Sequence, residues 1–219
     1  MAKLSVAKSP GTNIVSIQER MRAEVTSLAE RTAPPSGDAI SITQDKHFKL
    51  PNGTKHAGPL QLVIVDFISQ NMFYEGTYDP NSISPPACFA IGTVPSTLAP
   101  SKNAPNKQSD KCTGCPMNEF GSAGKGKACK NTCVLAVLPV DADVDTPLFI
   151  LKVSPTALKA FGGYVNAVAA KFNLPPMGVI TEISFDPSLE YASLRFGNPR
   201  PAGDDLLALA FSRRDEARK

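Results

Sequence analysis

Apolar residues near the start of the chain recur at intervals of three and four, the spacing of one face of an α-helix. The residues of this stripe are Ile17, Met21, Val25 and Leu28. A capping box, Ser16-x-x-Glu19, precedes them and Pro34-Pro35 follows, so we expect an amphipathic helix over residues 16–31. This helix and a loose arm before it form an N-terminal segment, residues 1–35, which would pack on its own chain or on a second copy in a homo-oligomer.

From residue 36 onward, apolar and polar residues alternate over short runs that are separated by turns containing Pro, Gly or Asn, and this pattern predicts β-strands. The predicted strands cover residues 39–43, 46–50, 60–68, 85–91, 133–138, 148–153, 178–185 and 191–196. Residues 155–172 interrupt the pattern with one helical apolar face. A last helix is expected from Asp204, because its acidic start and basic end suit the helix dipole.

Many short strands with one helix before a final hairpin predict a mainly β fold with flanking helices. The absence of regular strand–helix alternation in the sequence argues against a doubly wound parallel sheet. We expect an OB-like Greek-key barrel that carries a metal-binding loop insertion, with a β-sandwich as the alternative. The barrel would occupy residues 36–200, its cysteine loop residues 105–133, and the C-terminal helix residues 201–219.

Composition restricts the function and location that we expect. The net charge is +3, and 42% of the residues are hydrophobic, which is ordinary for a globular domain. The first eight residues lack the apolar stretch of a secretory signal, and no apolar run reaches membrane-spanning length. We therefore expect a cytoplasmic protein with no membrane partner, or a protein of the host-cell cytoplasm if a phage encodes it. In that reducing compartment cysteines bind metals more readily than they pair.

The most specific motif is Cys112-Thr-Gly-Cys115, because two cysteines separated by two residues point both sulfurs at one metal ion. Cys129 follows after thirteen residues and offers a third sulfur. The spacing leaves the fourth ligand open between Cys88, which follows Pro85-Pro86, and Cys133, which also suits the core face of a strand. Four thiolates would close a structural zinc site, and an iron–sulfur cluster uses the same ligands.

Aromatic and basic residues suggest a surface for single-stranded nucleic acid, whose bases stack on rings and whose phosphates need cations. Six lysines lie between residues 102 and 130, against Asp110 and Glu119. The candidate contact residues are Lys46, Phe48, Lys49, Phe73, Tyr74, Tyr78, Lys111, Lys125, Lys127, Lys130, Tyr191 and Arg195. Tyr191 and Arg195 would share one face of a predicted strand.

Two other functions are weighed against DNA binding. One is a protein–protein interaction module, a phage host-takeover or virion factor, in which the metal only shapes a loop. The other is a Mg²⁺-dependent nuclease built on Asp66, Glu75 and Asp79, although their spacing matches no known signature. Asp66 interrupts an apolar strand, and a salt bridge at that position is the more ordinary interpretation.

Several stretches resemble a family of tailed-phage single-stranded DNA-binding proteins. They are Leu62-Val-Ile-Val-Asp-Phe, Phe73-Tyr-Glu-Gly, Pro86-Ala-Cys-Phe-Ala-Ile-Gly, the cysteine–glycine segment from Cys112 to Lys130, Leu151-Lys-Val-Ser-Pro and Tyr191-Ala-Ser-Leu-Arg-Phe. The resemblance implies an OB-type fold with a metal-binding loop, a non-enzymatic role in DNA replication or recombination beside the enzymes of those processes, and the ligand set Cys88, Cys112, Cys115 and Cys129. The basic C-terminus differs from the acidic, partner-recruiting tail of many single-strand binders.

Overall fold

A computed structural model describes residues 38–76 and 84–218 of the chain. Contacts within the chain divide it into two units, Met1–Gly37 and Asp38–Lys219. The predicted N-terminal helix, Tyr78 and Asp79 therefore lie outside the described residues. Everything that follows concerns the second unit.

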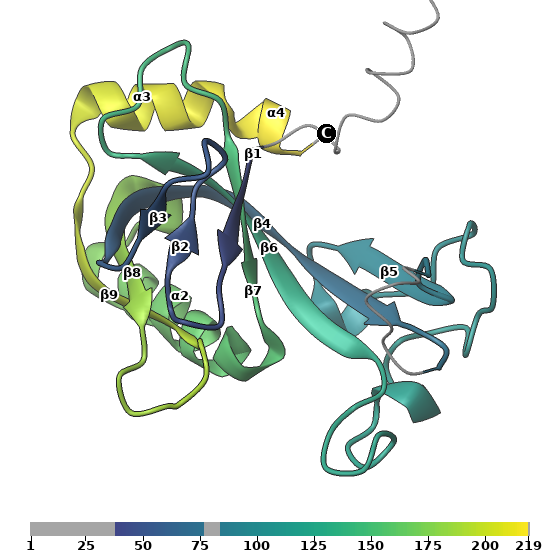
Figure 1. Ribbon diagram of the computed structural model, residues 1–219. Helices are drawn as coiled ribbons and strands as arrows, with labels where there is room; N and C mark the ends of the chain where they lie inside the picture. The colour runs from purple at the N-terminus through teal and green to yellow at the C-terminus, as the bar shows by residue number, and fades with distance from the viewer. Residues whose placement is uncertain (1–37, 77–83, 219) are drawn as a thin grey trace, which may run out of the picture. The chain divides into compact units, whose positions relative to one another are not determined.

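Nine strands of the described residues form one connected sheet (Figure 1). They are β1 (Asp38–Ile42), β2 (Phe48–Lys49), β3 (Lys55–His56), β4 (Leu60–Phe73), β5 (Cys88–Gly92), β6 (Lys130–Pro139), β7 (Phe149–Val153), β8 (Val179–Phe185) and β9 (Leu194–Pro201). Their order is β3-β2-β1-β7-β6-β4-β8-β9, and β5 pairs with β4. The mainly β prediction is confirmed: the sheet curls into a half-barrel with flanking helices. A single connected sheet favours the barrel type over the sandwich, and an OB-like barrel is compatible with it.

Helices cover both faces of the curled sheet. They are α2 (Leu158–Phe172), α3 (Asp204–Ser212) and α4 (Arg214–Ala217), with short 3-10 turns at Pro95–Thr97, Pro116–Asn118, Pro155–Ala157 and Pro176–Gly178. The apolar stripe of α2, with Phe161 and Val168, packs on a core that includes Leu135 and Leu151. On the opposite face, Ala210 of α3 packs with Val63 and Val65 of β4.

Strand β4 contributes side chains to both cores and carries a β-bulge between them. The pairing of β4 with β6 shifts between Ile64 and Asp66, which leaves Val65 as the extra residue of a β-bulge. Because side chains alternate along a strand, Ile64 faces the α2 side while Val63 faces α3. Val65 faces α3 by the same alternation, and the extra residue of the bulge then places Phe67 on the α2 side, where its ring lies against Phe161.

Strand β4 is longer than its hydrophobic pattern predicts, because it continues past Ile68 through polar residues to Phe73. Its first residues, Leu60–Val63, pair with β8, and its last residues, Ser69–Phe73, pair with β5. Strand β6 runs beside both halves. We call residues 69–76 and 84–132 the arm, and residues 38–68 and 133–218 the body. The arm carries the cysteine loop away from the body core (Figure 1).

The last strand also differs from its prediction. Strand β9 begins at Leu194, and Tyr191 belongs to the connection from β8, so Tyr191 and Arg195 do not share a strand face. The backbone N–H of Asp186 donates to the Ser193 carbonyl at 2.9 Å and closes this longer turn. Beyond Phe196 the strand runs through Pro199 and Pro201, which an edge strand tolerates because one side of its backbone needs no ladder partner.

Candidate metal cluster and nucleic-acid groove

Four of the five cysteines surround one small cavity in the arm. Cys88, Cys112, Cys115 and Cys129 are all buried, reduced thiols, and they line a space of about 10 Å³ together with Asn71 and Met117. A space of that size holds about one water-sized particle. The chain reaches it from β5, from the turn before Pro116–Asn118, and from the residue before β6.

The pKa shifts of these thiols reflect burial and the charge of neighbouring sulfurs. Burial raises the pKa of Cys112, a hydrogen bond from Asn71 opposes the shift, and the charges of Cys88 and Cys115 add to it. Burial raises the pKa of Cys129 to about 11, and Cys112, Cys115 and Cys88 act in the same direction. The four thiols lie close together, because all of them line the same small cavity.

Cys133 stands apart from this cluster. It belongs to the body core with Leu135 and Val153, and burial raises its pKa to about 12. Its partners across the sheet are Ser69 and Val153. The alternative of Cys133 as the fourth ligand therefore has no support in the fold, because the residue is a core side chain of β6.

The cysteine cluster has the donors for a soft metal but not a finished coordination shell. Four thiols are the ligand set of structural zinc sites, and their shared cavity has room for one ion. Within residues 38–76 and 84–218, however, no three Cys, His, Asp or Glu side chains are arranged so that they could hold a metal ion. Metal binding would require the thiols to turn toward the cavity and lose their protons.

A groove of about 1130 Å³ lies between the arm and the start of α2. Its floor is one face of the β4–β6 ribbon, with Phe67, Ser69 and Asn71 on β4 and with Asn131 and Cys133 on β6. One wall is formed by residues 155–166 at the start of α2, and the other by the cysteine loop. The groove exceeds the usual size of a small-molecule pocket and suits an extended ligand.

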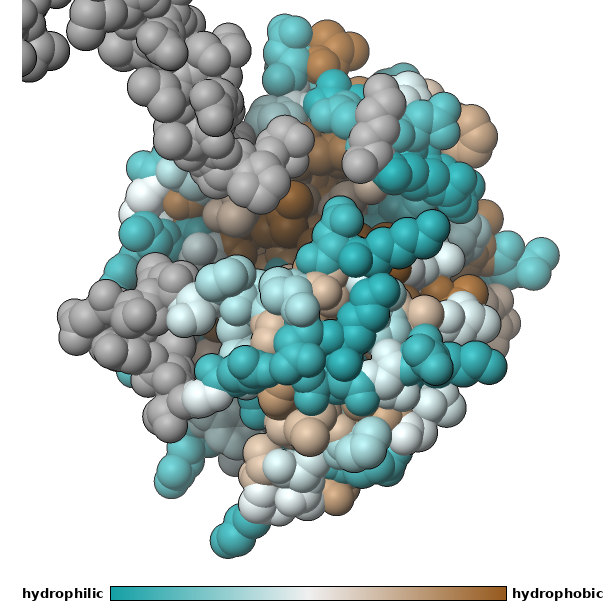
Figure 2. All heavy atoms as spheres, turned by 90° about the vertical axis from the view of Figure 1, so that its right-hand side faces the viewer, coloured by the Kyte–Doolittle hydropathy of each residue, from teal (hydrophilic) through white to brown (hydrophobic). Residues whose placement is uncertain are grey.

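The charge of this groove has a single sign. Lys125, Lys127, Lys130 and Lys159 line it, and among the residues that the structure describes none that lines it is acidic. Phe67, Phe120 and Phe161 add aromatic rings. Figure 2 shows the side of the molecule that carries the arm. Many of its surface residues are hydrophilic, and they border a recess of hydrophobic residues.

Phe120 is the most exposed large apolar residue of the described chain, at 82%. The Nζ atom of Lys127 lies 5.2 Å from the centre of its ring, within cation–π range. Lys127 also donates to Oδ1 of Asn118 at 3.4 Å, and Nδ2 of Asn118 donates to the Cys112 carbonyl at 2.9 Å. The cysteine loop therefore holds a ring and a cation side by side at the groove wall.

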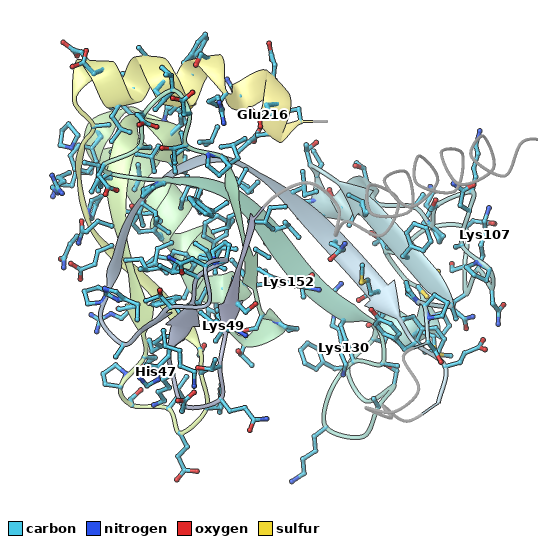
Figure 3. All side chains as sticks on the ribbon, turned by 45° about the horizontal axis from the view of Figure 1, so that its top comes forward. His47, Lys49, Lys107, Lys130, Lys152 and Glu216 are labelled. Carbon is cyan, nitrogen blue, oxygen red and sulfur yellow. The ribbon has the colours of Figure 1, made fainter. Side chains whose placement is uncertain are left out.

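The structure brings only some of the candidate nucleic-acid residues together. Lys125, Lys127 and Lys130 share the groove. Lys111 and Phe73 lie instead at the cysteine cavity, and Tyr74 is an exposed residue directly after β4. Lys130 lies on the arm, whereas Lys49 lies on the body (Figure 3).

Three other candidates lie on the body. Lys46, in the β1–β2 turn, donates to the Leu189 carbonyl of the β8–β9 connection. Tyr191, which is half exposed, follows Leu189 in that connection, and Arg195 is exposed at the start of β9. They form a region separate from the groove lining.

Phe48 is excluded as a base-stacking residue. Its side chain is fully buried, and its ring stacks on Phe185 with the centroids 4.5 Å apart. A ring that is packed inside the core has no face left for a base. The alternation in β2 places Phe48 inside and Lys49 outside, and sequence alone did not reveal which face was covered.

Sequence reasoning missed Phe120, Asn118 and Lys159. The sequence around Phe120 could have indicated that this ring is exposed. It is an aromatic residue in a loop of glycine, lysine and serine, which has few apolar side chains to cover it. The sequence gives no such indication for Lys159, because a lysine at the second position of an amphipathic helix is expected to be solvated. Its place in the groove depends on how α2 packs against β4 and β6.

The acidic residues weighed for a nuclease do not assemble. Oδ2 of Asp66 accepts a hydrogen bond from Nε of Arg218 at 2.7 Å, and its Oδ1 accepts the Phe67 N–H at 2.9 Å. Glu75 bonds Asn106 in the arm. The strand from Asp66 to Phe73 alone spans roughly 23 Å at about 3.3 Å per residue. These two carboxylates therefore cannot share one metal ion, and Asp79 lies outside the described residues.

No protein-family model, curated protein or solved structure matches this chain. Within the described residues, no helix combines the length and apolar character needed to cross a bilayer. The functional argument therefore rests on the groove and the cysteine cluster themselves.

Proposed function

We propose that this protein binds single-stranded DNA without catalysing a reaction, in phage DNA replication or recombination. The observation that carries the proposal is the groove, which combines four lysines and an exposed phenylalanine with no acidic residue among its described lining. Unpaired strands need this combination, because every base has a face that stacks and every nucleotide has a phosphate.

The position of the arm in the fold supports the same function. The arm is inserted between β4 and β6, and five strands of the body follow the order β7-β6-β4-β8-β9 with α2 between β7 and β8. In OB folds the loop between the first two strands is one of the loops that grip oligonucleotides. If β4 is the first strand of such a barrel, the cysteine loop occupies that position.

In this proposal zinc has a structural role. Cys88, Cys112, Cys115 and Cys129 would hold it and so fix the loop that presents Phe120, Lys125 and Lys127. Cys88 anchors the cluster to β5, and Cys129 anchors it to the start of β6. Zinc would therefore join both ends of the insertion to one point, which the small apolar cluster of the arm cannot do alone.

The test is a titration of fluorescein-labelled oligo-dT followed by anisotropy at several salt concentrations. We expect binding that weakens steeply with salt, because lysines that contact phosphates release counterions. Competition with unlabelled duplex should be weaker than competition with single strand. Absence of binding at low salt, or a preference for duplex, would refute the proposal. Incubation of the labelled strand with Mg²⁺ should leave it uncut.

A further inference from the structure

Two adjacent glycines lie in the interior of α2, and the packing of the fold requires neither of them. Gly162 and Gly163 are exposed, whereas Phe161 and Tyr164 on either side of them are buried. Apart from adjacent residues and the nearby backbone of α2, a Cβ atom added at either glycine would have no atom within 4 Å. Neither has a positive φ. Because only proline is less favourable than glycine inside a helix, alanine at both positions would stabilise α2.

The two glycines differ in their relation to the groove. Gly162 lines it together with Leu158 and Val165, whereas Gly163 does not. Residues three and four apart lie on one face of a helix, so Gly162 stands between these two side chains in the α2 wall. The backbone of α2 is therefore bare at one point of the groove. Glycine is the residue that allows a ligand to approach a backbone closely, and the groove supplies that reason here.

The part of the groove around Gly162 is apolar. Phe67 of the floor lies edge-on to Phe161 of α2, with the ring centroids 5.1 Å apart, and both rings line the groove. Leu158 and Val165, beside Gly162, are half-buried and pack on the body core. The flat face of a nucleobase suits such a surface, whereas a phosphate needs cations or hydrogen-bond donors.

A cation for the phosphate of the same nucleotide lies next to this apolar part. Lys159 precedes Gly162 by three positions, so the two residues are neighbours on the surface of α2, and both line the groove. Lys127 lies on the opposite wall, over the ring of Phe120. One nucleotide can therefore place its base over Gly162 while its phosphate lies toward Lys159.

We propose that the groove contains a nucleobase subsite, in which a base of single-stranded DNA packs flat against the α2 backbone at Gly162. This inference rests on the proposed function, because it assigns one part of the bound strand to one part of the same groove. The base lies between Leu158 and Val165, and its phosphate lies toward Lys159. A side chain at position 162 would occupy the space of the base.

Gly162→Val tests the subsite, because valine keeps one preferred rotamer in a helix and cannot swing aside. The dissociation constant of labelled oligo-dT, measured by anisotropy with the full chain, should rise by about 5- to 150-fold, the loss of one base contact. Gly163→Val is the matched control, since it makes the same change one residue further on and outside the groove. It should bind like the wild type. Both variants should unfold at a urea concentration no lower than the wild type, because valine suits a helix better than glycine.

An oligomer of abasic nucleotides shows which part of the strand lies at Gly162. It keeps the phosphates and lacks the bases, so at low salt the wild type and Gly162→Val should bind it equally. If Gly162→Val weakened binding to the abasic oligomer as much as binding to oligo-dT, the sugar–phosphate chain would lie at this position. The assignment of a base to the subsite would then be wrong.

The outcomes separate this inference from the proposed function. If oligo-dT binds the wild type and Gly162→Val equally tightly, or if Gly163→Val weakens binding as much as Gly162→Val, the inference is overturned while DNA binding stands. If the wild type does not bind oligo-dT at low salt, the proposed function itself fails. Should Gly162→Val prove unstable, Gly162→Ala takes its place. That variant should show a smaller loss of affinity, and wild-type affinity would overturn the inference.

Discussion

The body and the arm are built from one sheet but are held together differently. The body buries long apolar side chains on both faces of the sheet, beneath α2 and beneath α3. The arm has a small cluster of buried hydrophobic residues, Ala90, Leu98 and Cys112. Hydrophobic burial contributes about 25 cal/mol per Å², so the arm gains far less from it than the body.

Backbone hydrogen bonds join the loop segments of the arm and position its cysteines. Cys112 N–H donates to the Leu98 carbonyl at 2.9 Å, and Cys129 N–H donates to the Met117 carbonyl at 2.8 Å. The cysteines are thus fixed by the same bonds that join the loop segments. Most of the groove's lysines also come from the arm. The large apolar cores and most of the proposed ligand contacts therefore lie in different regions of one domain.

The largest expected effect tests the body. Phe48→Ala should lower the free energy of unfolding by about 3–5 kcal/mol, because it removes a fully buried ring that stacks on Phe185. Urea denaturation followed by circular dichroism measures the change. The folded fraction should bind oligo-dT like the wild type.

Phe48→Leu is the control for that experiment, since it keeps an apolar side chain in the core and should cost less than the alanine variant. If Phe48→Ala left stability intact and weakened DNA binding, the residue would be a ligand contact. The division of roles between body and arm would then be wrong.

The second effect tests the arm. Phe120→Ala should weaken oligo-dT binding by about 1–3 kcal/mol, the usual contribution of a base stacked on an aromatic ring. The free energy of unfolding should stay within about 0.5 kcal/mol, because the side chain is 82% exposed. Anisotropy and urea titrations measure the two quantities.

Tyr191→Ala is the matched control, because it removes another exposed aromatic residue, from the β8–β9 connection of the body. It should bind oligo-dT like the wild type. If the two variants lost equal affinity, the binding surface would extend across the body, and the groove would be only part of it.

Sequence patterns predicted the elements of the body well, and the reason is physical. Helix α2 and strands β6, β7 and β8 each bury one periodic face, so their sequences carry the period of the element. The motif Cys112-x-x-Cys115 with Cys129 likewise marked the cluster, because a tight turn fixes which residues meet. The second half of β4 was missed, since its polar residues are ordered by pairing with β5 and β6.

The groove could not be predicted, because its walls come from segments that are distant in sequence. Lys127 and Lys159 line the same groove only because α2 packs on the β4–β6 ribbon. The assignment of Phe48 as a base-stacking residue was wrong for a related reason. Alternation shows that Phe48 and Lys49 face opposite ways, but the covering elements decide which of them is inside.

The third effect concerns Cys133, the cysteine of the body core, at alkaline pH. Burial raises the pKa of Cys133 from 9.0 to about 12. Between these values the unfolded chain loses the thiol proton while the folded chain keeps it, so the free energy of unfolding falls as pH rises. Cys133 contributes at most about 1.4 kcal/mol per pH unit to this fall.

Cys133→Ala should therefore lose stability less steeply than the wild type above pH 9, in urea titrations at several pH values. Below pH 9 the difference between the two proteins should be constant. Identical slopes would show that Cys133 does not keep its proton in the folded state. Its assignment to the body core, apart from the arm thiols, would then be doubtful.

The smallest effect concerns the ion pair between Arg218, directly after α4, and Asp66 in the middle of β4. Arg218→Ala removes the 2.7 Å bond to Asp66. It should lower the free energy of unfolding by about 0.2–1 kcal/mol, the usual range for an exposed ion pair, and less at high salt. Arg214, with Nε 4.0 Å from Oδ2, remains as a second cation. Because the contact belongs to the body, binding to oligo-dT should not change. A loss of DNA affinity without a loss of stability would place Asp66 and Arg218 in the binding surface.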